Sequence, residues 1–328
     1  MSSSNSARTR LHVVSGKGGT GKTTVAAALA LALAEQGRRT LLVEVEGRQG
    51  IAQLFETEAL PYEERRIAIG PGGGEVYALA VDAERALLDY LQMFYKLGGA
   101  GRALRRLGAV DFATTIAPGL RDVLLTGKVC EAVRRRPDGG GWAYDAVVMD
   151  APPTGRITRF LGVNDEVAGL ARVGPIHHQA QAVMRVLKSA ETAVHLVTLL
   201  EEMPVQETAD GVAELRAAGL PVGSVVVNMV RPPVADGLPP AGDPSGSDAD
   251  RPVLAAALER AGLRGTTALA GPLLAEGRAY GRRLALEAAQ RAELAGLGLP
   301  VRELPLLPDG ADLAGLYRQA RRLRDLEW

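Results

Sequence analysis

The sequence predicts an α/β fold, a doubly wound and mostly parallel sheet with helices on both faces. Short apolar segments alternate with longer segments of helical pattern, which is typical of strands joined by crossover helices. Residues 146–149 are continuously apolar, and so is most of 222–227, as expected for strands buried on both faces. A glycine-rich turn follows the first apolar segment and precedes an Ala- and Leu-rich stretch, so strand, turn and helix come in that order.

The individual elements follow from local signals. Asp82 is a good N-cap for a helix that runs to about Leu97, because its side chain can accept a hydrogen bond from the first turn. Gly and Pro at residues 70–74 predict a tight turn. The stretches 98–136 and 151–191 exceed an ordinary crossover, so a helical layer over the strand ends is expected. The expected strands are 11–15, 40–46, 76–81, 145–150, 193–199, 223–228 and 301–305.

The chain is expected to form a single domain over residues 11–328, after a disordered N-terminus at residues 1–10. Helical insertions are expected at about 83–136 and 156–191. A flexible loop is expected at about 232–251, because a segment so rich in Pro, Gly, Ser and Asp buries too little apolar surface to order itself. No internal repeat is visible in the sequence.

Composition limits the classes to which the protein can belong. The 328 residues are 47% hydrophobic, enough for a sizeable core. The 38 basic residues balance 38 acidic ones, so no overall charge favours nucleic acid, and none is expected as a partner. No segment approaches the roughly 18 apolar residues of a membrane span, and residues 1–10 lack a signal-peptide core. The single cysteine, Cys130, excludes an internal disulfide, so a cytoplasmic location with at most peripheral membrane contact is expected.

The glycine-rich turn has the spacing of a phosphate-binding P-loop, Gly-x4-Gly-Lys-[Ser/Thr]. Its glycines let backbone N–H groups close on phosphate oxygens, and the following helix directs its positive end to the same anion. Lys22 is expected to pair with the β- and γ-phosphates and the Thr23 hydroxyl to ligate Mg²⁺, so ATP and Mg²⁺ are the expected ligands. The expected nucleotide-binding residues here are Gly16, Gly18, Gly19, Thr20, Gly21, Lys22, Thr23 and Thr24.

A second lysine, Lys17, lies at the start of the motif. Residues 17–24 resemble the deviant Walker A motif of the dimeric ATPases that include nitrogenase iron protein, the Min and Par positioning ATPases and the arsenite-pump ATPases. In that family the first lysine reaches across the dimer interface to the partner's nucleotide. The resemblance implies that Lys17 acts in trans on the phosphates, as an arginine finger does. The alternative is a solvated loop lysine.

An acidic residue, Asp150, ends a predicted apolar strand, as the Mg²⁺-water ligand of a P-loop ATPase does. The segment from Asp150 to Leu161 (Asp-Ala-Pro-Pro-Thr-Gly-Arg-Ile-Thr-Arg-Phe-Leu) resembles switch II of the arsenite-pump ATPase (ArsA) family, which includes the factor that targets tail-anchored membrane proteins. The expected metal ligands are therefore Thr23 and Asp150, the latter directly or through water. The alternative for Asp150 is a helix cap.

Two further segments extend the resemblance. Asn228 follows a Val-rich strand and is similar to the family's adenine-reading asparagine, whose amide offers a donor and an acceptor to a purine edge. Pro305 and Leu306 lie in a segment that resembles the family's late adenine-cradling loop. A turn residue is the alternative for Asn228.

The loop after the second strand departs from the family pattern. ArsA-like proteins read Asp-Pro-Ala-His there, and their Asp orients the attacking water, whereas this chain has Glu46-Gly47-Arg48-Gln49, in a segment that resembles a bacterial branch. Glu46 is longer by one methylene, and a misplacement of ~1 Å can slow a reaction on the order of 100-fold. Hydrolysis is therefore expected to be slow or to need a partner, with Arg48 and Gln49 as candidates for compensating contacts. The expected catalytic residues are Lys17, Lys22 and Glu46; the alternative is that 44–50 is only a polar loop.

Cysteine usage separates the chain from relatives with metal sites. Arsenite sensing and the zinc of the targeting factor both use several cysteines, so Cys130 alone is expected to be a buried apolar residue. Arg102, Arg105, Arg106 and residues 134–136 suggest a basic helical surface, for which a solvated face is the simpler interpretation. The C-terminal stretch from Asp312 to Trp328 predicts an amphipathic helix that packs on the sheet rather than on a membrane.

Together these features predict an ArsA-like, dimeric ATPase that couples its nucleotide state to a helical surface for an unidentified protein client. The dimer is expected to be a homodimer or a heterodimer with a paralogue. One alternative is an ATP-binding subunit that scarcely hydrolyses ATP, which the Glu46 departure motivates. A Min- or Par-like positioning ATPase is the second alternative.

Overall fold

The computed structural model describes residues 9–95, 119–170, 175–232 and 250–325. Its centre is a sheet in which eight strands of the described residues take the order β3-β4-β2-β5-β1-β6-β7-β8. All neighbours pair in parallel except β3 and β4, which form an antiparallel edge. The strands are β1 (Leu11–Gly16), β2 (Thr40–Glu44), β3 (Arg65–Ile69), β4 (Glu75–Ala80), β5 (Ala146–Asp150), β6 (Thr192–Thr198), β7 (Val222–Val230) and β8 (Val301–Pro305).

Helices cover both faces of this sheet, because side chains of successive strand residues point to opposite faces and both sets are apolar. Leu11 and Val13 belong to a core shared with one group of helices, whereas Val14 belongs to a core shared with the other group. The first group is α3 (Ala83–Tyr95), α6 (Leu120–Arg134), α7 (Thr154–Leu170), α8 (Pro175–Leu187) and α9 (Glu202–Ala217). The second is α1 (Lys22–Glu35), α2 (Gly50–Leu54) and α12 (Leu313–Arg324). The doubly wound α/β fold expected from the sequence is confirmed.

Helix α12 packs mainly on α1 and also contacts β8, whereas the sequence predicted packing on the sheet. Asp312 caps it by accepting a hydrogen bond from the Gly315 amide, at 2.6 Å. Leu316, Ala320 and Leu323 are all fully buried, so the apolar stripe of this helix is used inside the domain.

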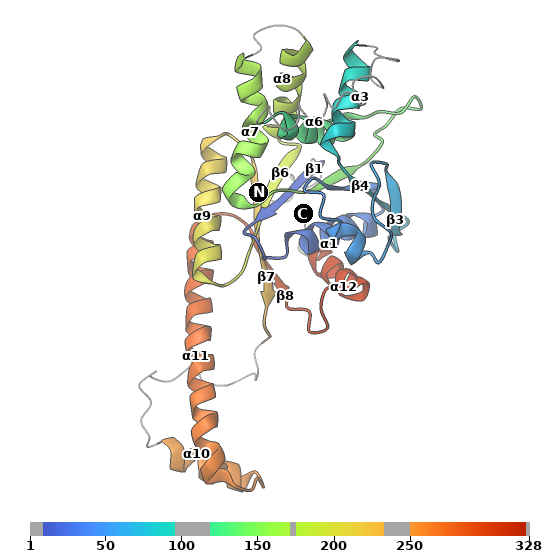
Figure 1. Ribbon diagram of the computed structural model, residues 1–328. Coiled ribbons are helices and arrows are strands. Elements are labelled where there is room, and N and C mark those ends of the chain that lie inside the picture. The colour runs from blue at the N-terminus through green and yellow to red at the C-terminus, as the bar shows by residue number, and fades with distance from the viewer. Residues whose placement is uncertain (1–8, 96–118, 171–174, 233–249, 326–328) are drawn as a thin grey trace.

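A helical arm leaves the domain at the opposite end from α3, α6, α7 and α8 (Figure 1). It consists of α10 (Asp250–Arg260), which packs on the far part of α11 (Thr266–Gly296), a helix of 31 residues. The near part of α11 lies beside α9 and returns the chain to β8. The sequence did not predict this arm.

Several boundaries differ from those expected. Thr9 and Arg10, expected within the disordered N-terminus, are buried, and the Arg10 guanidinium donates to the Tyr144 carbonyl at 3.0 Å. Strand β3 was not predicted; it forms a hairpin with β4 through the predicted turn at 70–74, where the Gly70 amide donates to the Gly74 carbonyl.

Some predictions cannot be placed. Asp250 and Arg251, expected in the flexible loop at 232–251, begin α10, while residues 233–249 lie outside the described residues. Residues 98–118 of the expected helical insertion, with Arg102, also lie outside them. Within the residues that the structure describes, no helix is both long and apolar enough to span a membrane.

Candidate functional site

The turn between β1 and α1 forms a cradle, here called the phosphate cradle (residues 16–24), at the carboxyl end of the central strand. Two of its glycines leave no room for a side chain. A Cβ on Gly16 would collide with the Val197 carbonyl oxygen, and a Cβ on Gly21 (φ 84°) would collide with the Asn228 amide. The Thr20 hydroxyl closes the loop by donating to the Lys17 carbonyl at 2.8 Å. The backbone of this turn is therefore held in a compact form that can surround an anion.

Lys22, Thr23 and Asp150 meet at the base of the cradle. Lys22 is 8% exposed and forms no ion pair with any residue that the structure describes. The Thr23 hydroxyl donates to Asp150 Oδ2 at 2.7 Å, while Asp150 Oδ1 is buried without a hydrogen-bond partner. Strand register explains the meeting, because β5 pairs with β1 and brings Asp150 opposite Val14, just before the cradle.

Burial raises the pKa of Asp150 to about 6; the hydrogen bond from Thr23 and the charge of Lys22 oppose the shift, and Glu44 and Glu46 add to it. An ionised carboxylate in such surroundings is unfavourable unless a cation compensates it. The unpaired Oδ1 and the adjacent Thr23 hydroxyl therefore fit a divalent cation with oxygen ligands.

Asn228 lies on the other side of the cradle. Its side-chain amide donates to the Thr20 carbonyl at 2.9 Å, and its side chain is 6% exposed. Register places Pro305 beside Val230, and the Leu306 amide donates to the Val230 carbonyl at 2.8 Å. The three residues expected to contact a base, Asn228, Pro305 and Leu306, thus lie on adjacent chain segments beside the phosphate cradle.

Lys17 is directed toward α9, where its Nζ lies 3.2 Å from Glu207 Oε1. Both side chains are about one-third exposed, at 32% and 39%, so this ion pair is accessible to water and weak. Glu207 Oε2 is buried without a hydrogen-bond partner. In a single chain, therefore, Lys17 is paired within its own subunit.

The loop after β2 is organised around its own backbone. Glu44, at the end of β2, accepts hydrogen bonds from the amides of Gln49 and Ile51 and so caps α2. The Gln49 side chain exchanges two hydrogen bonds with the backbone of Leu60, so it is not a free contact for the cradle, contrary to expectation. Arg48 is 73% exposed and pairs with Glu46 at 3.6 Å.

Glu46 itself has a partly exposed side chain, at 21%, and it is close enough to influence Asp150 electrostatically. Gly50, at the start of α2, lies against Thr23, because a Cβ built on Gly50 would be 3.2 Å from the Thr23 methyl group. The loop is thus next to the cradle, with its one available carboxylate, Glu46, near the Mg²⁺-ligand candidates.

The turn after β5 connects the cradle to the helices on one face. The Ser15 hydroxyl donates to the Pro152 carbonyl at 2.6 Å, which ties the end of β1 to this turn. Helix α7 begins at Thr154, and Arg156 in its first turn lies 3.8 Å from Asp122 at the start of α6. The turn thus leads from Asp150 into α7, and the contact between Arg156 and Asp122 joins α7 to α6.

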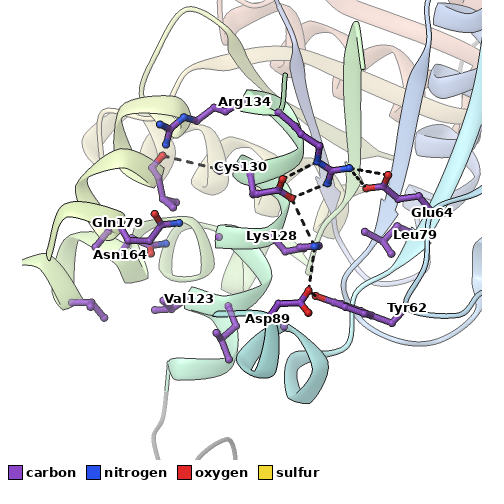
Figure 2. A pocket seen from close by; sticks show the side chains of 18 of the residues that line it. Tyr62, Glu64, Leu79, Asp89, Val123, Lys128, Cys130, Arg134, Asn164 and Gln179 are labelled. Carbon is purple, nitrogen blue, oxygen red and sulfur yellow. Dashed lines mark hydrogen bonds and ion pairs between the residues drawn. The ribbon is translucent and has the colours of Figure 1, made fainter. Parts of the chain in front are cut away.

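Beyond this turn lies a cavity of about 1020 Å³, here called the helical cavity. Figure 2 shows a charged wall on one side of it. Glu131 lies between Lys128 and Arg135; Lys128 also approaches Asp89. The Arg135 guanidinium also binds both carboxylate oxygens of Glu64, at 2.8 and 2.9 Å. Its charge is therefore neutralised, so Arg135 itself does not contribute to the basic surface expected for residues 134–136.

The opposite wall of the helical cavity comes from α7 and α8 and is less polar (Figure 2). Asn164 donates to Thr126 at 2.8 Å, so its position is fixed by α6. Cys130 is buried against the Val183 carbonyl, and burial raises the pKa of its thiol to about 12, so it is the inert apolar residue that was expected. The apolar lining residues are Leu79, Ala86, Val123, Leu124, Val167, Ala180 and Val183.

Three contacts at this site were not predicted from the sequence. Glu44 was passed over because its role depends on where α2 begins. The partner of Lys17 was missed because Glu207 lies far along the chain. Met229, with φ 55° and 41% exposure, follows Asn228 and lies beside Gly21. A bulky residue in left-handed conformation is a sign of function that only a structure can reveal.

Comparison with known proteins gives consistent results. Residues 9–190, more than half of the chain, match the family described as anion-transporting ATPase. ATPase BagA of Mycobacterium tuberculosis is 52% identical over 314 residues, which cover 96% of this chain and 92% of that protein. ATPase GET3 of Eremothecium gossypii is 26% identical over 250 residues, or 66% of this chain and 70% of that protein. ATPase GET3 of Kluyveromyces lactis is 27% identical over 251 residues, or 66% of this chain and 71% of that protein.

Proposed function

Because this chain belongs to the ArsA-like family of anion-transporting ATPases, we propose that it is a Mg²⁺-dependent ATPase that works as a dimeric switch. The reaction would be ATP + H₂O to ADP + phosphate. The observation that carries the proposal is the meeting of Lys22, Thr23 and Asp150 at the base of the phosphate cradle. A buried lysine without a counter-ion in the described residues, next to a buried carboxylate with an unpaired oxygen, suits a phosphate–cation pair.

Each part of the cradle has a role in this proposal. The backbone amides of residues 16–24 surround the phosphates, and Lys22 pairs with the β- and γ-phosphates. Thr23 and Asp150 would hold Mg²⁺, which would supply positive charge to neutralise the phosphate oxygens. Asn228, Pro305 and Leu306 would contact the adenine.

Glu46, the available carboxylate beside Asp150, is assigned the role of orienting the attacking water. Its ion pair with Arg48 must open or turn before Glu46 can orient a water molecule. The other polar side chains of this loop are already hydrogen-bonded, because Glu44 caps α2 and Gln49 binds the backbone of Leu60. Slow hydrolysis by the isolated chain is the expected consequence.

Lys17 would act on the nucleotide of the second subunit. In the single chain it pairs with Glu207, an exposed contact that contributes roughly 0–1 kcal/mol. Release of Lys17 is therefore easy when a second subunit and its nucleotide present phosphate charges. The dimer would be a homodimer, and a heterodimer with a paralogue is the second candidate. The hydrogen bonds within the loop after β2 favour the heterodimer, because a partner subunit could supply a better-placed group to orient the water.

The helical cavity is our candidate for the surface that responds to nucleotide. Helix α7 starts four residues after Asp150 and carries Asn164 into the cavity wall. The contact between Arg156 and Asp122 joins α7 to α6, which carries Lys128 and Glu131 of the charged wall. Closure around ATP would thus move two walls of the cavity, where an unidentified client would bind. A cytoplasmic location is proposed with this role.

The trans role of Lys17 can be tested by complementation. Lys22→Ala removes nucleotide binding but keeps Lys17, whereas Lys17→Ala keeps the cradle but lacks the trans lysine. Each variant alone is expected to release phosphate at background rate. Mixing them should restore up to about half of the wild-type rate per intact site, because the first variant lends its Lys17 to the second.

The outcomes separate the candidates. No phosphate release by wild type, together with tight Mg²⁺-dependent ATP binding, would favour the heterodimer subunit. Full activity of Lys17→Ala alone would reject the trans role. Tight ATP-dependent binding to lipid vesicles or DNA would instead favour a Min- or Par-like positioning ATPase.

A further inference from the structure

Strand β7 contains an irregularity directly after Asn228. Three steps along β7, from Val227 to Val230, match only two steps along β8, so β7 holds one extra residue there and forms a β-bulge. Met229 lies within the bulge and has φ 55°, a left-handed conformation that is rare for a bulky residue. Such a conformation persists only where the surrounding contacts hold it in place.

The bulge changes the side to which the side chains of β7 point. In a regular strand successive side chains point to opposite faces of the sheet. Val226 belongs to the core on the side of α1, whereas Val225 and Val227 belong to the core on the side of α9 and α11. Regular alternation would place Val230 on the side of Val226, yet Val230 packs against the core that contains Val227. The alternation is therefore shifted by one residue across the bulge, where Met229 has the left-handed backbone.

Because of this shift, two consecutive side chains meet the same glycine of the phosphate cradle. A Cβ built on Gly21 would collide with the Asn228 amide nitrogen and would lie 3.3 Å from the Met229 Cε methyl carbon. The Thr20 carbonyl can only accept a hydrogen bond, so the amide nitrogen of Asn228 must face it and the amide oxygen faces elsewhere. Asn228 is 6% exposed and Met229 is 41% exposed. Asn228 thus presents a polar group at this edge of the cradle, and Met229 presents an apolar surface next to it.

We propose that Met229 is a base-contacting residue of the nucleotide site, whose thioether side chain packs on the face of the base while Asn228 contacts the edge. The inference rests on the proposed ATP site and adds a residue that no sequence motif marks. The sulfur and methyl group of methionine pack favourably on aromatic rings, and a nucleotide base is a flat aromatic ligand. Leu306, which is 37% exposed, follows β8, and its amide donates to the Val230 carbonyl. Exposed apolar side chains therefore come from both chain segments at this end of β7.

The left-handed backbone makes this arrangement possible. In a regular strand Met229 would point to the side of Val227, opposite to Asn228. Glycine adopts the left-handed conformation without steric cost, so a methionine at this position indicates a role for its side chain. The backbone of Met229 and its side chain thus make separate contributions, and substitutions can isolate each of them.

The test compares two ligands by titration calorimetry, ATP and inorganic triphosphate, both with Mg²⁺. Inorganic triphosphate shares the phosphates of ATP but has no base. Met229→Gly keeps the left-handed backbone and removes the side chain, so the dissociation constant of ATP should rise ~3–10-fold while that of inorganic triphosphate stays within about twofold. Met229→Leu keeps an apolar side chain of similar size, so ATP binding should return to within about twofold of wild type.

Glu56→Gly is the matched control for the backbone. Glu56 also has a left-handed conformation, with φ 51°, but lies in the turn after α2. Its replacement should change neither dissociation constant by more than about twofold. Both glycine variants should keep or raise the midpoint of thermal unfolding, because glycine relieves the backbone. Met229→Val should weaken ATP binding more than Met229→Gly does, because a branched side chain opposes the left-handed conformation and disturbs Asn228 as well.

The two ligands separate this inference from the proposed function. Equal weakening of ATP and inorganic triphosphate in Met229→Gly would give Met229 a structural role alone and would overturn the inference. Unchanged ATP binding in Met229→Gly would overturn it too. If wild-type protein bound neither ligand in the presence of Mg²⁺, the proposed ATP site would itself be rejected, and this inference with it.

Discussion

The carboxyl ends of β1 and β5 and the carboxyl end of β2 lie side by side in one sheet, yet they are organised differently. At the ends of β1 and β5, Asp150 Oδ1 accepts no hydrogen bond, and Lys22 forms no ion pair with a described residue. At β2 the side chain of Glu44 is committed to two backbone amides and that of Gln49 to Leu60. The polar groups of the first region are available to a ligand, whereas those of the second region already have hydrogen-bond partners within the chain.

This difference separates binding from hydrolysis. Unpaired buried groups are unfavourable alone and strengthen the binding of a complementary ligand. A satisfied loop must break contacts before it contributes to catalysis, so its rearrangement adds to the barrier. We therefore expect an isolated subunit to bind Mg²⁺ and ATP well and to hydrolyse ATP slowly.

The largest expected effect comes from Glu46. Glu46→Gln keeps the size of the side chain but removes its ability to accept a proton, and turnover should fall on the order of 100-fold while ATP affinity changes less than about twofold. Phosphate release and equilibrium binding on the same preparation check this. Glu44→Gln is the matched control, since it lies two residues away and caps α2; it should lower the free energy of unfolding by about 1–2 kcal/mol. A greater loss of turnover in Glu44→Gln would reverse the two assignments.

The next effect concerns Asp150, where binding and stability should change in opposite directions. The pKa of Asp150 is raised in the folded protein to about 6. The favourable contribution of its carboxyl group to the free energy of unfolding is therefore present below the unfolded pKa of 3.8 and is lost as pH rises through about 6. Asp150→Asn should therefore stabilise the ligand-free protein at pH 7, on the order of 2 kcal/mol, and not at pH 3.5. It should also weaken Mg²⁺-dependent ATP binding at least ~10-fold. Thermal unfolding with and without Mg²⁺ and ATP measures both; a destabilised ligand-free variant would contradict the cation-site interpretation.

A smaller effect is expected at Glu207. Glu207→Gln removes the charge that holds Lys17 within its own subunit, so specific turnover at low protein concentration should rise up to about threefold, in keeping with a weak, exposed pair. Asp210→Asn, one turn further along α9, is a control that should leave turnover unchanged. Reduced turnover in Glu207→Gln would mean that Glu207 assists the reaction rather than restrains Lys17.

The smallest effect on turnover is expected at two histidines on neighbouring strands, β1 and β6. His12 and His195 are buried, stacked and hydrogen-bonded at 3.2 Å, and burial lowers the pKa of both, that of His195 to about 3. The contribution of the two histidines to the free energy of unfolding is therefore fully present above their unfolded pKa near 6.5 and is lost as pH falls toward 3. His195→Gln should flatten this loss in urea unfolding measured from pH 7 to pH 4, without a change in ATP affinity at pH 7. An unchanged slope would exclude the histidine pair as its source.

The positions of the cradle and of Asp150 in the fold could be predicted from the sequence because the signals are local. Nine consecutive residues define the cradle, and Asp150 ends a continuously apolar strand that must lie beside β1 in a parallel sheet. The fold class followed from the same alternation of strands and helices.

The remaining features could not be predicted for physical reasons. Strand β3 begins with exposed Arg65 and Arg66 and pairs at an edge, so it lacks the apolar pattern of a buried strand. Helix α11 contains Pro272 and several glycines, which weaken the helical signal. The contacts of Lys17 with Glu207 and of Gln49 with Leu60 depend on how separate segments meet, which no local pattern encodes.

One measurement tests the central claim most directly: ATP affinity and phosphate release, followed in the same samples across a wide range of protein concentration, with Lys22→Ala as the blank. If the cradle is complete in one chain and Lys17 acts on a second, affinity should be independent of concentration while specific turnover rises with it. Specific turnover that stays constant above the blank at every concentration would contradict the account, because each chain would then complete its own catalytic site.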